Sequence, residues 1–224
     1  GTIRMQPINR PIRWGILGTG AIAAAFAKAL RQVTDTTLLA VGSRSQTSAN
    51  AFAQTYDVGR AYASYAELAG DPDVDVVYVA TPHTAHFENT MLCLGAGKHV
   101  LCEKPFALNS VQTEQMVTLA KRNGLFLMEA MWMRFIPLII DLRRRIDAGH
   151  IGQVRMIRAD LGFRAPRNPQ SRLFSPELAG GALLDLGIYP LAFSAALLGE
   201  PTEITSLANI GATGIDEQSA YVLK

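Results

Sequence analysis

The sequence predicts an α/β fold: a parallel sheet with helices on both faces, followed by a smaller α+β part. Short apolar runs alternate with helical stretches over residues 12–101, and this repeated order implies parallel strands joined by helices. The run 75–80, Asp-Val-Val-Tyr-Val-Ala, is typical of a strand buried on both faces. After Gly149 polar and apolar residues alternate, as in an antiparallel sheet with one exposed face. We therefore expect one domain over 1–150 and a second over 151–224.

Each element of this fold is expected from its pattern and its flanking residues. In the first domain the strands are expected at 12–17, 37–42, 60–62, 75–80, 99–102 and 125–128, and the helices at 21–32, 46–54, 65–69, 84–94, 109–123 and 138–148. Ser45 is expected to cap the second helix, and Gly124 to end the fifth. The second domain is expected to hold strands at 153–163, 204–209 and 218–223 and a helix at 182–198. The last strand is apolar and has no following partner, so we expect the chain to be truncated at its C-terminus.

Composition and charge exclude several classes of function. Lys and Arg number 21 and Asp and Glu 19, and the net charge of +2 is too small to indicate binding to nucleic acid or to an acidic membrane surface. No apolar run approaches the roughly 18 residues of a membrane-spanning helix. Gly15, Gly18 and Gly20 interrupt the one segment that is similar to a secretory leader. Cys93 and Cys102 are expected to be reduced thiols, so the predicted location is the cytoplasm.

A glycine-rich segment follows the first predicted strand. It reads Gly18-Thr19-Gly20-Ala21-Ile22-Ala23 and fits the pattern G-x-G-x-x-(G/A) between a strand and a helix. The first glycine permits a tight turn, the second lets the backbone approach a pyrophosphate, and the alanine allows close helix packing. The helix N-terminus then offers N–H groups and a positive dipole end to phosphates. The alternative is a glycine-rich turn that binds nothing.

The end of the second strand discriminates between the two nicotinamide cofactors. An acidic residue there would bind a ribose 2′-hydroxyl and select NAD, but the sequence has Gly42-Ser43-Arg44, and the nearest acid, Asp35, precedes the strand. Ser43 can donate a hydrogen bond, and Arg44 can form a charged fork with a 2′-phosphate. The predicted cofactor is therefore NADP. The alternative is a solvated arginine on the surface.

Two further loops follow strands at the same edge of the sheet. Glu103-Lys104-Pro105 places Lys104 where a substrate would lie, although a surface lysine is the simpler interpretation. Thr81 and Pro82 end the fourth strand and are expected to line the crevice beside the cofactor, with His83 and His86 three residues apart on the following helix. One or both histidines are expected to line the crevice, capping or packing being the alternative. No cysteine or carboxylate set accompanies them, so no metal is predicted.

A third segment opens the late helix and carries a carboxylate and a phenol. It begins with Gly180-Gly181 and contains Asp185 and Tyr189, which are four residues apart and so share one face of a helix. Such a pair can orient a hydroxyl-rich substrate and exchange a proton with it. A tyrosine ordinarily has a pKa near 10, so acid–base work near neutral pH needs a cation nearby, and Lys104 is the candidate. The alternative is that both are surface residues of the helix.

Together the glycine-rich turn, Glu103-Lys104-Pro105 and the Gly180–Tyr189 segment resemble the glucose–fructose oxidoreductase / inositol dehydrogenase family, over the chain from Ile12 onward. Residues 129–135, Glu-Ala-Met-Trp-Met-Arg-Phe, are similar to the branch that holds dimeric dihydrodiol dehydrogenase and NADP-dependent D-xylose dehydrogenase. The resemblance implies a Rossmann domain followed by an open, mostly antiparallel sheet for substrate binding and dimerisation. Family members continue past the point where this chain ends, which puts an intact substrate pocket and dimer face in doubt.

The resemblance also implies roles for individual residues. Lys104 matches the family's catalytic lysine, Tyr189 the proton donor of this branch, and Asp185 the carboxylate of the shared motif. Arg44 matches the residue that contacts the NADP phosphate. Trp132 and His83 are expected at the substrate, and the expected cofactor contacts are Gly18, Thr19, Gly20, Ala21, Ile22, Ser43, Arg44, Thr81, Pro82, His86, Glu103 and Lys104.

The sequence therefore predicts an NADP-dependent oxidoreductase. It would transfer a hydride between the nicotinamide and a hydroxyl-bearing carbon of a sugar, a cyclic polyol or a trans-dihydrodiol. The expected partners are this small molecule and, where the sheet is complete, a second copy of the chain, with neither nucleic acid nor membrane. The alternative is a non-catalytic NADP-binding protein, either a sensor or a truncated relic.

Overall fold

The computed structural model describes residues 10–224, so the start of the predicted domain 1–150 lies outside the described part. The chain divides into two compact units between Ala130 and Met131, whereas the sequence analysis expects a boundary near residue 150. The helix α6 (Pro137–Asp147) accounts for the difference, because it packs on the short 3₁₀ turn Trp132–Phe135 within the second unit.

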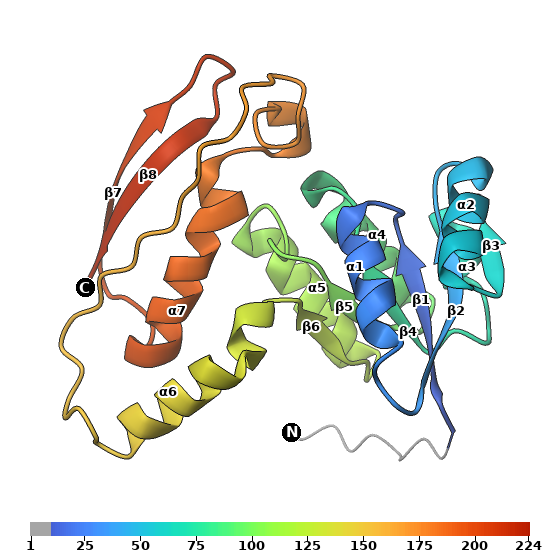
Figure 1. Cartoon of the computed structure of the whole chain (residues 1–224), viewed down its shortest axis with the longest axis horizontal. Coiled ribbons are helices and arrows are strands. Elements are labelled where there is room, and N and C mark those ends of the chain that lie inside the picture. Colours follow the sequence, from blue (N-terminus) through green and yellow to red (C-terminus); the bar gives the residue numbers. More distant parts are fainter. Residues whose placement is uncertain (1–9) are drawn as a thin grey trace. The chain divides into compact units, whose positions relative to one another are not determined.

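The first unit contains a parallel sheet of six strands, which confirms the predicted fold class. Its strands are β1 (Ile12–Leu17), β2 (Thr36–Gly42), β3 (Arg60–Tyr62), β4 (Val76–Val79), β5 (His99–Cys102) and β6 (Leu127–Glu129), and its helices are α1 (Ala21–Leu30), α2 (Gln46–Tyr56), α3 (Tyr65–Ala69), α4 (His86–Gly95) and α5 (Ser110–Arg122). The order is β3-β2-β1-β4-β5-β6 with every pair parallel (Figure 1). The strand order reverses between β1 and β4, and doubly wound sheets bind ligands at that point.

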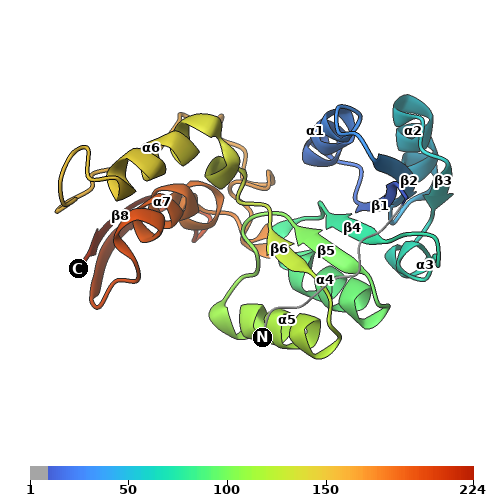
Figure 2. The same cartoon turned by 90° about the horizontal axis from the view of Figure 1, so that it is seen from below.

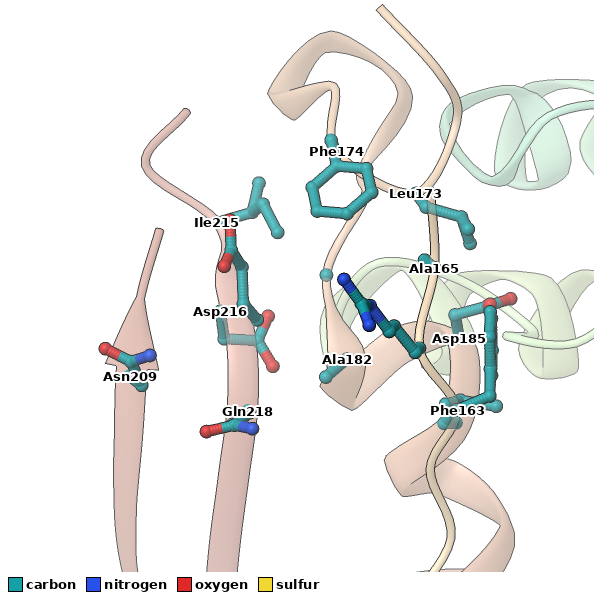
Figure 3. A pocket seen from close by; sticks show the side chains of 14 residues that line it. Phe163, Ala165, Leu173, Phe174, Ala182, Asp185, Asn209, Ile215, Asp216 and Gln218 are labelled. Carbon is teal, nitrogen blue, oxygen red and sulfur yellow. The ribbon is translucent and has the colours of Figure 1, made fainter. Parts of the chain in front are cut away.

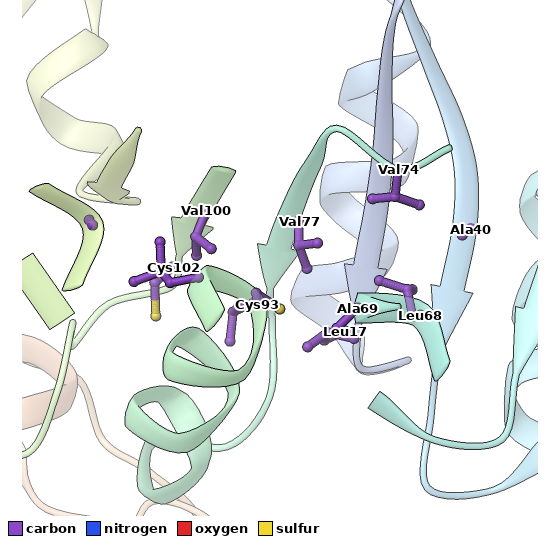
Figure 4. Close-up of a cluster of buried hydrophobic side chains, with 12 residues drawn as sticks. Leu17, Ala40, Leu68, Ala69, Val74, Val77, Cys93, Val100 and Cys102 are labelled. Carbon is purple, nitrogen blue, oxygen red and sulfur yellow. The ribbon is translucent and has the colours of Figure 1, made fainter. Parts of the chain in front are cut away.

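Side chains from both faces of this sheet are buried. Figure 2 shows α1 and α2 on one face and α3, α4 and α5 on the other. Because successive strand residues point to opposite faces, Leu17 and Val77 join the cluster under α3, α4 and α5 (Figure 4), whereas Ile16 and Tyr78 join the cluster under α1 and α2. This two-sided burial explains the nearly continuous apolar runs of the strands.

Local signals in the sequence set the helix ends. The Ser45 hydroxyl accepts a hydrogen bond from the Ser48 N–H at the start of α2, as predicted. Asn109 caps α5 in the same way through the Gln112 N–H. Gly124 follows α5 with a φ of +65°, a conformation in which glycine carries no Cβ penalty. These caps hold the helices in register with the strands that follow them.

Charged side chains connect the chain at the starts of strands β1, β4 and β5. The Asp75 carboxylate, just before β4, accepts from the guanidinium groups of Arg10 and Arg13. Beside it the Lys98 ammonium is buried and donates to the backbone carbonyls of Asp71 at 2.5 Å and Val74 at 2.9 Å. Burial lowers the pKa of Lys98. These two contacts join the start of β5 to the turn before β4.

The second unit consists of helices and one β-hairpin. Its elements are α6, the 3₁₀ turns Trp132–Phe135 and Pro176–Leu178, a π-helical turn at Leu183–Gly187, α7 (Ile188–Leu198), β7 (Ile204–Ile210) and β8 (Asp216–Leu223). The strands pair antiparallel, as expected, with a register shift between Asn209 and Ile210. The predicted helix 182–198 is helical throughout, but its first turn is π rather than α.

The expected strand at 153–163 does not form, and this prediction is wrong. Residues 151–170 hold no helix or strand, and Met156 and Phe163 are exposed. The alternation of polar and apolar residues predicts which side chains a strand would expose. A strand also needs a neighbouring strand that forms hydrogen bonds with its backbone. Within residues 10–224, the hairpin β7–β8 is a two-stranded sheet to which this segment does not pair.

One segment corrects the expectation that no apolar run is long enough to span a membrane. By length and composition alone, Pro176–Leu198 is long and apolar enough to cross a membrane, and 11% of its most apolar stretch is buried inside the protein. Their backbone is not one continuous helix, since Ala179 and Gly181 have φ values of +53° and +121°. Asp185, inside the segment, forms an ion pair with Arg172. A broken backbone and a charge are both unfavourable in hydrocarbon unless other protein covers them.

We predict that Lys98→Met destabilises the first unit. The substitution removes the Lys98 donor from both carbonyl oxygens; that of Asp71 keeps the Val74 N–H at 3.2 Å, whereas the Val74 carbonyl loses its ammonium donor. A buried acceptor left unsatisfied costs about 1–3 kcal/mol in the free energy of unfolding. Lys121→Met, an exposed site at the end of α5, is the matched control and is expected to change stability by about 0.5 kcal/mol or less. Urea unfolding measures both, and equal midpoints for the two variants would contradict the role given to Lys98.

Candidate active site

The turn after β1 brings the backbone against the end of β4. Gly18 has a φ of +103°, and its N–H donates to the Gly42 carbonyl at 2.9 Å. A Cβ at this position would lie 2.6 Å from the carbonyl oxygen of Ala80. Because backbone cannot move away as a flexible side chain can, only glycine fits here. The turn therefore aligns the ends of β1, β2 and β4.

The second glycine of the turn opens the helix α1. Gly20 is its N-terminal cap residue and makes no side-chain capping bond. A Cβ on Gly20 would meet no atom within 4 Å, so the space above this backbone is open. Ala23, one turn later, is fully buried against the sheet. The first N–H groups of α1 thus face open space at the positive end of a helix dipole, as pyrophosphate binding requires.

The end of β2 offers a cation and no carboxylate. Arg44 is exposed and, among residues 10–224, forms neither a hydrogen bond nor an ion pair. Ser43 is buried, and its hydroxyl oxygen accepts the Ser45 N–H at 3.3 Å. Asp35 lies at the opposite end of β2, where its carbonyl accepts the Ile12 N–H. A guanidinium at this edge fits a 2′-phosphate better than a bare ribose diol.

His86 joins the two loops that follow β4 and β5. Its ring is 1% exposed, with Nδ1 2.7 Å from the Pro105 carbonyl oxygen and Nε2 2.8 Å from the Thr81 carbonyl oxygen. Burial lowers the pKa of His86, whereas both carbonyl contacts act to raise it. The sequence analysis expects His86 to contact the cofactor, but both ring nitrogens are engaged by backbone. Its side chain therefore fixes the loops rather than presenting a free nitrogen to a ligand.

Two carboxylates accept hydrogen bonds from the backbone around Lys104. The Tyr78 hydroxyl donates to Oε1 of Glu103, and Oε2 of Glu103 accepts the Lys104 N–H at 3.0 Å. Glu129, at the end of β6, accepts the Phe106 N–H at 3.0 Å. Burial, followed by the Glu103 charge, raises the pKa of Tyr78, so this phenol stays a donor. Lys104 itself is half-buried and precedes a cis proline.

In the second unit, the π turn and α7 carry the predicted acid–base residues. Asp185 is 6% exposed, and its Oδ1 lies 2.8 Å from a guanidinium nitrogen of Arg172. The Tyr189 hydroxyl accepts the indole N–H of Trp132 at 3.0 Å, with the two rings edge to face at 6.0 Å. An N–H donor placed on a phenolic oxygen stabilises negative charge that develops there. Single π turns are frequent at functional sites.

Asp185 also lines a cavity of about 320 Å³ within the second unit. Phe163, Leu173, Phe174 and Ile215 supply apolar walls, and Asp216, Asn209 and Gln218 supply polar ones (Figure 3). Asn209 and Gln218 are direct cross-strand partners in the hairpin. The mixture of rings with a few polar groups, and the volume, suit a small organic molecule that carries hydroxyl groups.

Comparison with family models identifies both parts of the chain. Residues 12–131 match the oxidoreductase family with an NAD-binding Rossmann fold, GFO/IDH/MocA, and residues 139–224 match the GFO/IDH/MocA C-terminal domain. The chain belongs to the GFO/IDH/MocA oxidoreductase family. This confirms the family resemblance and the fold class that the motifs predict.

Curated relatives in this family are dehydrogenases. The chain is 41% identical over 217 residues to trans-1,2-dihydrobenzene-1,2-diol dehydrogenase of Mus musculus, and 42% identical over 239 residues to D-xylose 1-dehydrogenase (NADP(+)) of Hypocrea jecorina. These matches cover 95% and 94% of this chain but 65% and 61% of the two relatives. The chain therefore spans less than two thirds of the length of either, and both belong to the branch that residues 129–135 indicate.

Solved structures of GFO/IDH/MocA relatives share the fold. KijD10, a 3-ketoreductase from Actinomadura kijaniata in complex with NADP and TDP-benzene, superposes with a TM-score of 0.78 at 32% identity, covering 89% of this chain and 61% of KijD10. An NAD-binding oxidoreductase from Klebsiella pneumoniae superposes with a TM-score of 0.82 at 28% identity, covering 94% and 62%.

The GFO/IDH/MocA fold brings most of the predicted cofactor residues to one edge of the sheet. They follow β1, β2, β4 and β5, which are neighbours in the order β2-β1-β4-β5: Gly18, Thr19, Gly20, Ala21, Ile22, Ser43, Arg44, Thr81, Pro82, Glu103 and Lys104. His83 is half-buried, with its ring centroid 5.7 Å from that of His86. Searched over residues 10–224, the chain holds no group of three metal-ligating side chains. The individual cofactor and substrate roles stay predictions.

The sequence analysis missed the residues that hold the candidate groups in place. The Tyr78 hydroxyl donates to Glu103, and Glu129 accepts the Phe106 N–H. Arg172 donates to Asp185. A signal existed for Tyr78 alone, since a tyrosine inside a buried strand needs a partner for its hydroxyl. Glu129 and Arg172 lie 23 and 13 residues from their partners along the chain, and no local pattern links such pairs.

We predict different effects for alanine at the two glycines of the turn. Gly18→Ala places a Cβ against the Ala80 carbonyl at a positive φ, so the free energy of unfolding is expected to fall by about 2 kcal/mol or more. Gly20→Ala, which meets open space, is expected to cost about 1 kcal/mol or less and to weaken dinucleotide binding instead. Urea unfolding and NADPH fluorescence separate the two. A Gly20→Ala variant that binds NADPH like the parent would contradict the placement of the pyrophosphate.

Proposed function

We propose that the chain carries the cofactor site and the acid–base residues of an NADP-dependent dehydrogenase. Its substrate is a sugar, a cyclic polyol or a trans-dihydrodiol with an oxidisable secondary or anomeric hydroxyl. The observation that carries this proposal is the open backbone at Gly20, on the same sheet edge as Arg44 and Lys104. The dehydrogenase names of the two curated relatives, one of them NADP-dependent, support it.

The residues of the first unit have the charge and the free backbone N–H groups that NADP binding requires. The first N–H groups of α1 bind the pyrophosphate, and Arg44 binds the 2′-phosphate through a charge-assisted fork. Glu103 and the loop at Thr81 border the nicotinamide end, since both follow strands next to the reversal point of the sheet. The bound nicotinamide supplies the acceptor for the substrate hydride.

The acid–base work falls to side chains of the chain itself. Tyr189, as the phenolate, takes the hydroxyl proton of the substrate as the carbon–hydrogen bond breaks and releases hydride, and the phenol returns the proton in the reverse reaction. Trp132 stabilises the phenolic oxygen while it carries negative charge, through the 3.0 Å indole contact. Lys104 supplies positive charge to the reacting oxygen, and Asp185, oriented by Arg172, holds a substrate hydroxyl.

We also propose a cytoplasmic location and a homodimer. Cys93 and Cys102 are buried free thiols, which suits a reducing compartment. Ile204, Leu207 and Val222 of the hairpin are exposed by 65%, 79% and 72%, and apolar strands exposed to this extent favour pairing with another chain. We propose that the sheet containing the hairpin β7–β8, where it is complete, forms the dimer surface.

Cofactor preference is the first test. In fluorescence titrations we expect the chain to bind NADPH at least about tenfold more tightly than NADH, because an arginine–phosphate pair contributes about 1.5–3 kcal/mol. Arg44→Ala is expected to remove that preference without weakening NADH binding, and Arg122→Ala, an exposed arginine at the end of α5, to leave it unchanged. An Arg44→Ala variant that keeps the preference would exclude Arg44 from the phosphate site.

Turnover is the second test, with a panel of aldoses, cyclic polyols and trans-dihydrodiols in the presence of NADP. Lys104→Met and Tyr189→Phe are each expected to lower kcat about a hundredfold or more, the usual range for acid–base groups, while NADPH affinity stays within about twofold. Near-parent turnover in either variant would remove that residue from the mechanism. A chain that binds NADPH tightly yet oxidises none of the panel would be the non-catalytic NADP-binding protein instead.

A further inference from the structure

A carboxylate from the hairpin sits at the N-terminus of the helix that bears Asp185 and Tyr189. The Leu183 N–H donates to Oδ2 of Asp216 at 2.7 Å, across 33 residues of chain. The Ser219 hydroxyl donates to the same oxygen at 2.7 Å. Ala182, the cap residue in sequence, makes no side-chain capping bond. Asp216 therefore supplies from β8 the acceptor that a helix start needs.

The glycines of the Gly180-Gly181 segment make room for this carboxylate. Gly181 has a φ of +121°, and a Cβ on it would lie 2.2 Å from Oδ1 of Asp216. A Cβ on Gly180 would lie 2.7 Å from the carbonyl oxygen of Leu173, which also accepts the Gly181 N–H at 3.0 Å. Because neither glycine has a side chain, the Leu173 carbonyl and the Asp216 carboxylate can both approach the start of the helix.

Strand β8 contacts the π turn at both of its ends. Asp216 bonds to Leu183, the first residue of the turn, and a Cβ on Gly187, the last residue, would lie 3.5 Å from the Tyr221 hydroxyl. A π turn is a rare conformation that surrounding contacts must hold in place. Figure 3 shows Asp216 and Asp185 both lining the cavity of the second unit.

We propose that Asp216 is a positioning residue: from β8 its carboxylate holds the π turn so that Asp185 and Tyr189 keep their catalytic placement. This rests on the proposed function, since the helix is the one that carries the acid–base residues. Arg172 holds the Asp185 carboxylate directly, whereas Asp216 holds the backbone two residues before Asp185. Asp216 touches neither reacting atom nor cofactor in this role.

Kinetics of three variants test the proposal. Asp216→Ala is expected to lower kcat about tenfold to a hundredfold, because small misplacements of reacting groups have effects of this size, with KM and NADPH affinity within about threefold. The pH midpoint of kcat is expected to move with it. Asp216→Asn keeps an oxygen for the Leu183 N–H and is expected to restore most of the rate. Ala220→Ser, at an exposed site of the same strand, is the matched control and is expected to leave kcat unchanged.

Three results would overturn the proposal. One is an Asp216→Ala variant that melts at a lower temperature but keeps the parent kcat and pH profile, which would make Asp216 a stabilising cap only. Another is a rise in KM in both Asp216 variants with unchanged kcat, which would make Asp216 a substrate contact. The third is an Asn variant that is no better than the Ala variant. Where Asp216→Ala does not fold, Ser219→Ala, which removes the second donor to the same oxygen, is expected to show a smaller loss in kcat.

A spectroscopic readout separates this proposal from the proposed function. The chain has two tryptophans, Trp14 and Trp132, so in a Trp14→Phe background the emission reports Trp132 at its contact with Tyr189. Asp216→Ala is expected to shift that emission and Ala220→Ser to leave it unchanged, whether or not any substrate is oxidised. An unchanged emission in Asp216→Ala would refute the positioning role even in an active enzyme.

Discussion

The backbone of Gly18 approaches the carbonyl oxygen of Ala80 so closely that a Cβ would lie 2.6 Å from that oxygen. This contact brings the end of β1 against the end of β4, where the strand order reverses. The open backbone at Gly20, the start of α1 and the loop at Thr81 all depend on it. Through His86, which joins the carbonyls of Thr81 and Pro105, the same constraint reaches the loop that carries Lys104. The absence of a side chain at Gly18 thus sets the geometry of this edge of the sheet, where the candidate cofactor residues lie.

The second unit contains the same kind of close contact at a glycine. A Cβ on Gly181 would lie 2.2 Å from the carboxylate of Asp216, so glycine admits the group that caps the helix carrying Asp185 and Tyr189. In both units a glycine at positive φ removes a steric barrier, and a partner distant in sequence occupies the space that results. In both, the candidate catalytic groups are then supported by buried contacts: Tyr78 and Glu103 around Lys104, and Arg172 at Asp185. Such supporting shells decide whether a reactive side chain is held closely enough to act.

The differences between the sequence analysis and the structure have specific causes. Residues 153–163 have the alternation of a strand but gain no neighbour for their backbone, so they stay irregular. His86 stands where a cofactor contact is expected, yet two carbonyl oxygens engage its ring. The predicted helix 182–198 does form, and contacts with β8 accompany a π turn at its start, which the sequence analysis does not foresee. Each of these outcomes depends on residues far away in the chain, which periodicity and spacing do not reveal.

The sequence by itself determined the elements of the first unit, their parallel order and the family to which the chain belongs. Apolar periodicity, capping residues and glycine spacing act over a few residues, so they are readable without tertiary information. Only the tertiary structure decided which groups hold the functional side chains, namely Tyr78 on Glu103, Trp132 on Tyr189, Arg172 on Asp185 and Asp216 at the helix start. Those contacts join residues 13 to 57 positions apart. Their existence follows from how strands and loops meet in space, which is a property of the whole packed chain.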